Sequence, residues 1–206
     1  MAARKPDPAR AGESADRFSR RVNTLPSTTP EMTTPDLRFP IGRFSFTAAD
    51  DNSRAEAIAI IADLPSRLRA AIAGMSDAQL ETPYRDGGWT VRQVVHHLPD
   101  SHLNAFARFK FALTEDQPQI KAYDEAKWAE LPDGRTGPVA PSLSLLDGLH
   151  ARWALLLRAM SASDFGRQLV HPQNGVMTLD RMLALYAWHS RHHVSHITEL
   201  KRREEW

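Results

Sequence analysis

Cysteine is absent from the 206 residues. This absence excludes disulfides, thiolate metal ligands, Fe–S clusters and a cysteine nucleophile, and it is typical of a reducing compartment such as the cytoplasm. Long apolar runs are also absent, since none approaches the roughly 20 residues needed to cross a bilayer. A net charge of +1 shows how closely the basic and acidic residues balance. These features favour a cytoplasmic protein with no membrane or nucleic acid as its partner.

The first 41 residues lack helical or strand periodicity and are rich in Pro, Ser, Thr and Arg. Such a segment cannot bury enough apolar surface to offset its ordering entropy. It also lacks the apolar region of a secretory signal. The composition therefore predicts a disordered extension over residues 1–41, with Met32 as an alternative start, followed by one domain over residues 42–206.

Strand patterns are missing from the remainder, whereas helical periodicity recurs from Ser53 onward. Thr90 and Gln93 have the spacing of a capping box, and Thr178 is a suitable N-cap for the last helix. Prolines and glycines break the segment 115–142, which predicts a long crossover between distant helices. The pattern thus predicts an all-α fold, a four-helix bundle, with helices over residues 53–75, 91–114, 143–161 and 179–206.

Four of the nine histidines lie close together in the last predicted helix: His189, His192, His193 and His196. At about 100° per residue they share one face, on which His189 and His193 are nearest the apolar stripe and His192 lies at its edge. Imidazoles at positions i and i+4 can point at one ion from consecutive turns. This spacing predicts a metal site, but not the HExxH protease motif, because Ser190 replaces its glutamate.

The second predicted helix offers His96, His97 and His102 as a third ligand. His96 falls on the solvent side of the helical wheel, and His102 falls near the apolar centre as a hydrogen-bonded core residue. His97 is the best candidate, because it lies on the flank of a polar stripe typical of a pocket lining. Three imidazoles would leave a coordination position open for water or substrate. The stripe continues through Ser101, Asn104 and Arg108.

Four stretches resemble, in the same order, the YfiT family of metal-dependent hydrolases in the DinB-like superfamily. They are TPYRDGGWTVRQVVHHLPDSHLNAFARFK, KAYDEAKWAEL, LHARWALLLR and LALYAWHSRHHVSHITEL. The resemblance implies a DinB/YfiT-like four-helix bundle with a long crossover between the second and third helices. It also implies a homodimer and one divalent ion per subunit, zinc or alternatively nickel, bound by His97, His189 and His193. Pro99 departs from the family pattern and predicts a local kink beside His97.

Family resemblance leaves three functions open. The first is hydrolysis of a small-molecule substrate, in which the ion lowers the pKa of water and polarises an ester or amide. The second is transfer of a low-molecular-weight thiol of the bacillithiol type, which must come from outside a chain without cysteine. The third is a metal-binding stress protein without catalysis. Asp124, Glu125 and Arg108 are further candidates for the active site, the acids as a base and the arginine as a ligand for a substrate carboxylate.

Overall fold

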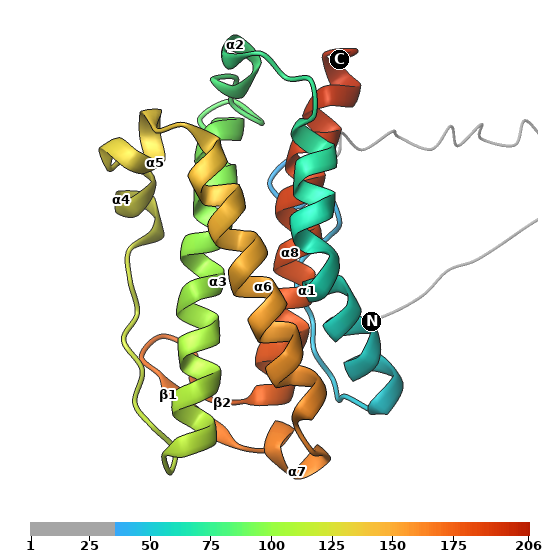
Figure 1. Ribbon diagram of the computed structural model, residues 1–206, viewed down its shortest axis with the longest axis vertical. Coiled ribbons are helices and arrows are strands. Elements are labelled where there is room, and N and C mark those ends of the chain that lie inside the picture. The colour runs from blue at the N-terminus through green and yellow to red at the C-terminus, as the bar shows by residue number, and fades with distance from the viewer. Residues whose placement is uncertain (1–35) are drawn as a thin grey trace, which may run out of the picture. The chain divides into compact units, whose positions relative to one another are not determined.

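Residues 36–206 are described by a computed structural model, in which four long helices form a bundle (Figure 1). Residues 1–35 of the extension predicted over residues 1–41 lie outside the described residues. Within the described part of the chain, no helix is both long and apolar enough to cross a membrane. The predicted four-helix fold is therefore confirmed, with the long helices α1 (Asp51–Ile72), α3 (Val91–Thr114), α6 (Val139–Ala159) and α8 (Leu179–Arg203).

The long helices pack as two parallel pairs. In Figure 1, α1 and α8 run from bottom to top, whereas α3 and α6 run from top to bottom. Each long helix packs on its parallel partner and on one helix of the other pair. Helix α1 packs on α8 and α6, and α3 packs on α6 and α8. Because α3 and α6 are parallel neighbours, the chain must return along the bundle between them. The predicted long crossover is confirmed, but the two helices that it joins are adjacent and not distant.

The crossover contains two short helices, α4 (Glu125–Ala129) and α5 (Pro132–Thr136), which lie beside the upper part of α3 in Figure 1. The following helix begins at Val139, earlier than the predicted residue 143, and includes Pro141 in its first turn. Proline is tolerated there because the first amides of a helix have no intrahelical acceptor. Two further short helices, α2 (Asp77–Leu80) and α7 (Ala162–Phe165), lie at opposite ends of the bundle.

A β-hairpin, absent from the predicted elements, connects α7 to α8. Its strands β1 (Gln168–His171) and β2 (Gly175–Thr178) pair antiparallel. The crossover adds to it, because the Val170 amide donates to the Pro118 carbonyl at 2.9 Å and the Ile120 amide donates to the Val170 carbonyl at 3.0 Å. A strand of four residues is too short to show a clear alternating pattern. Strand β1 also depends on pairing with the crossover, which is distant in sequence. The expectation of no strand was therefore wrong.

The predicted helix starts are confirmed at Thr90 and Thr178, each of which accepts a backbone hydrogen bond through its side chain. At the start of α3 the box is reciprocal, because the Gln93 side chain accepts from the Thr90 amide at 3.0 Å. The chain stays helical through Pro65 in α1 and through Pro99 in α3.

The core consists of two apolar clusters, one around Trp153 and the other around Leu98. Along α3 the Leu98 cluster ends at Leu98 and the Trp153 cluster begins at Ala105. Along α8 the Trp153 cluster ends at Ala187 and the Leu98 cluster begins at Ile197. The intervening turns of both helices carry histidines. Apolar packing above and below thus holds these polar turns at one level of the bundle.

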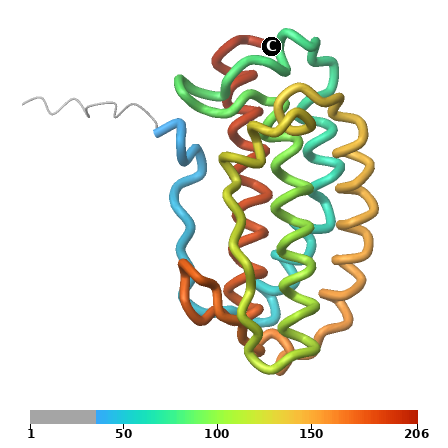
Figure 2. Tube along the Cα trace, turned by 90° about the vertical axis from the view of Figure 1, so that its left-hand side faces the viewer, coloured from blue at the N-terminus to red at the C-terminus, as the bar shows by residue number. Residues whose placement is uncertain are grey.

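Residues 36–50 run along the outside of α8 (Figure 2). The Phe39 ring lies 5.9 Å from the His192 ring, and the Trp188 indole donates to the Gly42 carbonyl at 3.3 Å. Residues 36–41, which composition assigned to the extension, therefore contact the bundle. This contact is decided by individual aromatic residues, which an average over the segment does not reveal.

Candidate metal centre

The structure brings the three predicted ligands together, although α3 and α8 supply them from distant parts of the sequence. One nitrogen from each of His97, His189 and His193 lies within 4.8 Å of the others. The Nε2 atoms of His97 and His189 are 3.2 Å apart. Two nitrogens bound tetrahedrally to zinc, at about 2.0–2.1 Å each, lie about 3.3 Å from one another. The donor set therefore fits a divalent ion in its type and spacing.

The charge state of these rings also suits a metal. Burial lowers the pKa of His97 to about 4, and it lowers the pKa of His189 and His193 well below the ordinary value. All three are consequently neutral at pH 7, with a lone pair free for an ion. The half-buried Trp89 ring packs on two of the ligands, with its centroid 4.7 Å from that of His97 and 6.2 Å from that of His193.

The two histidines predicted to lie on outer faces are in fact buried. His96 is 7% exposed, and its ring nitrogens lie 2.7 Å from the Ser142 hydroxyl and 3.1 Å from the Gly137 carbonyl. His192 is also 7% exposed and stacks on Trp188. A helical wheel locates the bundle core but ignores segments that cover the bundle from outside. The crossover covers His96, and residues 36–50 cover His192.

His102 conforms to its prediction as a hydrogen-bonded core residue. Its side chain is fully buried, and its Nε2 lies 3.1 Å from a ring nitrogen of His189. His196, the remaining histidine of the cluster on α8, stacks on Tyr84 with ring centroids 3.9 Å apart. Neither belongs to the three-histidine group whose nitrogens converge.

A cavity of about 330 Å³ opens beside the three histidines. It is bounded by α3, by the crossover and by the tip of the β-hairpin. Ser101 and Arg108 line it, which confirms the predicted pocket for that part of the polar stripe, whereas the Asn104 amide donates to the Asp100 carbonyl instead. The full lining is Trp89, His97, Ser101, Arg108, Ala122, Tyr123, Glu125, His171, Gln173, His189 and His193.

The two acidic candidates of the crossover, Asp124 and Glu125, differ in their position relative to the cavity. Glu125 lines the cavity, but Asp124 does not. Asp124 caps α4 by accepting from the Lys127 amide at 3.0 Å, and it pairs with the Lys127 ammonium at 2.9 Å. These contacts lower the pKa of Asp124 and leave it a structural role. The spacing of two adjacent acids cannot distinguish them, because the helix start decides which one turns inward.

Five lining residues were missed at the level of sequence: Trp89, Ala122, Tyr123, His171 and Gln173. Tyr123 lies in the stretch KAYDEAKWAEL, so the family resemblance was a usable signal for it. Burial raises its pKa to about 12, which keeps its phenol protonated as a hydrogen-bond donor. His171 and Gln173 reach the cavity through the hairpin, for which the sequence carries no comparable signal.

Comparison with known proteins identifies relatives that span nearly the whole domain. The DinB superfamily profile matches residues 60–197. A Bacillus subtilis protein named "putative metal-dependent hydrolase YfiT" is 48% identical over 85% of this chain and 99% of its own length. A Geobacillus thermodenitrificans protein named in the same way is 51% identical over 85% of this chain and all of its own length. The solved structure of Bacillus subtilis YfiT, described as an unusual four-helix bundle, superposes with a TM-score of 0.80 over 82% of this chain and 98% of that one.

Proposed function

Because the chain belongs to the DinB superfamily and, within it, to the YfiT-like proteins, we propose that it is a metal-dependent hydrolase of small molecules. The observation that carries this proposal is the convergence of three neutral imidazoles, His97, His189 and His193, at the wall of a cavity. We propose zinc as the ion, with nickel as the alternative, because imidazole ligands suit both. An ion held there would polarise the substrate carbonyl and acidify a water molecule.

The chain's own residues supply the proton transfers and the positioning. Glu125 is the one carboxylate among the lining residues in the described part of the chain. Its position at the start of α4 lets it accept the proton that an attacking water loses. The protonated phenol of Tyr123 can donate to an oxygen of the substrate. The cavity narrows the substrate class to small molecules, since its volume lies at the lower end of the range for ligand pockets.

A comparison of metal-loaded and chelated protein on a panel of esters and amides tests the proposal. Loaded protein should hydrolyse at least one member, and chelation should abolish the activity. Glu125→Gln should reduce kcat by roughly 10²- to 10⁴-fold, as expected for loss of a general base. Asp124→Asn is the matched control, because it changes the neighbouring acid without altering the cavity lining, and its kcat should stay within about twofold of the wild type.

The same panel separates the two other candidate functions. Turnover that requires an added thiol such as bacillithiol would identify an S-transferase, for which the absence of cysteine makes an external thiol necessary. Stoichiometric metal without turnover, with or without thiol, would identify a metal-binding protein that has no catalytic role. Hydrolysis that survives complete chelation would contradict all three.

A further inference from the structure

Arg108 is a buried cation that faces the cavity. The residue is only 7% exposed and belongs to the cavity lining. One of its guanidinium nitrogens, Nη2, donates to the Lys121 carbonyl at 2.9 Å. Among residues 36–206, no carboxylate lies within ion-pair distance of it, Glu125 included. The partners of its guanidinium in the described chain are thus this backbone carbonyl and the Tyr186 hydroxyl, so that some of its five donors remain for a ligand in the cavity.

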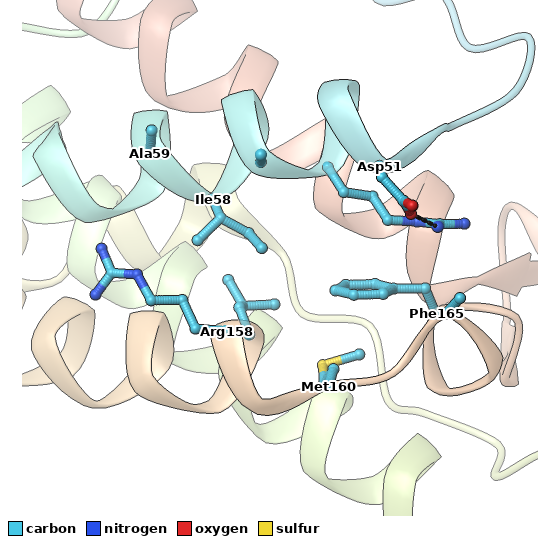
Figure 3. Close-up of a pocket in the computed structure, with 10 residues that line it drawn as sticks. Asp51, Ile58, Ala59, Arg158, Met160 and Phe165 are labelled. Atoms are coloured by element: carbon cyan, nitrogen blue, oxygen red, sulfur yellow. Dashed lines mark hydrogen bonds and ion pairs between the residues drawn. The ribbon is translucent and has the colours of Figure 1, made fainter.

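The other buried arginine of the described chain is paired with carboxylates. Arg92, also 7% exposed, forms ion pairs with Glu81 and Asp77. Arg54 binds Asp180 through two nitrogens, at 2.7 and 2.8 Å. This second pair lies beside a separate cavity of about 370 Å³ between α1, α6 and α7, shown in Figure 3. A buried charge without a counter-charge destabilises a fold strongly, so the lack of a carboxylate beside the buried Arg108 indicates an anion supplied from outside.

The position of Arg108 on α3 aligns it with the metal ligands. Eleven residues separate it from His97, which corresponds to about 20° of rotation and about 16 Å of rise along one helix face. Helical side chains lean toward the N-terminus, so the guanidinium approaches His97 from the far end of the cavity. Ser101 lies between them on the same face and also lines the cavity. A substrate can therefore place its reacting group near the histidines and a second group near Arg108.

We propose that Arg108 is the anion-binding subsite of this cavity and that the substrates are small molecules with a carboxylate remote from the reacting group. The proposal rests on the hydrolase function proposed above, which it deepens by naming the substrate class. A guanidinium binds a carboxylate through two parallel charge-assisted hydrogen bonds, which gives both affinity and orientation. Neutral esters of the same size lack this contact and bind less tightly.

Calorimetric titration of the metal-loaded, full-length protein with hexanoate and with its neutral counterpart hexanamide tests the subsite. Hexanoate should bind at least about 30-fold more tightly to the wild type, the factor expected for one buried charge-assisted pair. Arg108→Gln should remove this preference, and Arg108→Lys should retain part of it, because it keeps the charge without the fork. Arg152→Gln, an identical change on the outer face of α6, is the control and should leave the preference intact.

One further readout makes the result decisive. The Nε–H resonance of Arg108 should shift on addition of hexanoate but not of hexanamide. Equal binding of hexanoate to the wild type and to Arg108→Gln would overturn the proposal, because it would show the carboxylate on the metal alone. Failure of the wild type to prefer hexanoate would also overturn it. The two proposals fail in different ways. If the hydrolase proposal is wrong, metal-dependent turnover is absent, but hexanoate binding that depends on Arg108 is still observed.

Discussion

His102 Nε2 lies 3.1 Å from His189 Nδ1, on the side of the His189 ring that faces away from His97. For the Nε2 of His189 to present a lone pair to an ion, its Nδ1 must carry the proton. The fully buried His102 then accepts that proton's hydrogen bond and fixes the tautomer and the plane of the ligand ring. His102 is thus a positioning residue for the candidate metal centre.

Replacement of His102 should weaken metal binding without unfolding the bundle. His102→Phe keeps the aromatic volume and removes the acceptor, so zinc affinity should fall by roughly 10- to 100-fold, as observed for such outer ligands. His102→Gln restores an acceptor and should recover part of the loss. Competition titration with a chromogenic zinc chelator measures both. A residue with only a packing role would lower the melting temperature and leave the affinity unchanged.

The ligands themselves should be separable from their neighbours by metal content. His97→Ala, His189→Ala and His193→Ala should each abolish stoichiometric metal, as measured by mass spectrometry of tag-free protein. His96→Ala and His192→Ala should retain it, because their rings contact Ser142 and Trp188 and lie outside the converging group. Metal lost from the His192 variant and kept in the His193 variant would show that another pair of rings binds the ion.

Acid should destabilise the chelated protein well above the pH at which carboxylates titrate. Burial lowers the pKa of His97 and of His150 to about 4, against about 6.5 in the unfolded chain. The unfolded state therefore binds more protons below pH 6.5, and stability is lost as the pH falls toward 4. Each such histidine should lower the free energy of unfolding by about 1 kcal/mol between pH 6.5 and 5.5. Urea unfolding at pH 7.5, 6.5 and 5.5 measures this slope, and equal stability at all three would contradict it.

Removal of the metal should leave the helices intact. The apolar clusters around Trp153 and Leu98 are extensive and include no proposed ligand. The loss of stability should equal the linkage free energy, about 3–4 kcal/mol at 100 to 1,000 times the dissociation constant. Far-UV circular dichroism should therefore be unchanged at 25 °C, with a lower melting temperature. Global loss of helix on chelation would instead indicate a structural ion.

The ion pair between Arg54 and Asp180 should contribute measurably to the packing of α1 on α8. Both side chains are largely buried, at 16% and 15% exposure, and the contact is bidentate. Asp180→Asn should cost about 1–3 kcal/mol in the free energy of unfolding, because it leaves the guanidinium partly uncompensated. Asp63→Asn breaks the exposed pair with Arg67 and should cost less than about 1 kcal/mol. Equal costs would show that burial does not strengthen the Asp180 pair.

Local pattern was sufficient for several features that lie within one helix. The start of α3 at Thr90 and the start of α8 after Thr178 follow from side chains that accept hydrogen bonds three residues away. The convergence of His189 and His193 is likewise local, because a spacing of four residues places two rings on consecutive turns. Apolar periodicity also indicated that the apolar stripe of α8 is buried. These features depend on helix geometry alone, which the sequence by itself determines.

Only the tertiary structure decided what lies opposite or outside each helix. The burial of His96 depends on the crossover, and the burial of His192 depends on residues 36–50, neither of which enters a helical wheel. The hairpin forms because Val170 finds a partner strand in the crossover, far away in sequence. The lack of a carboxylate beside Arg108 is decided by the packing of the whole domain in the same way. Periodicity determines the direction in which a side chain leaves its own helix, whereas long-range packing determines what it meets there.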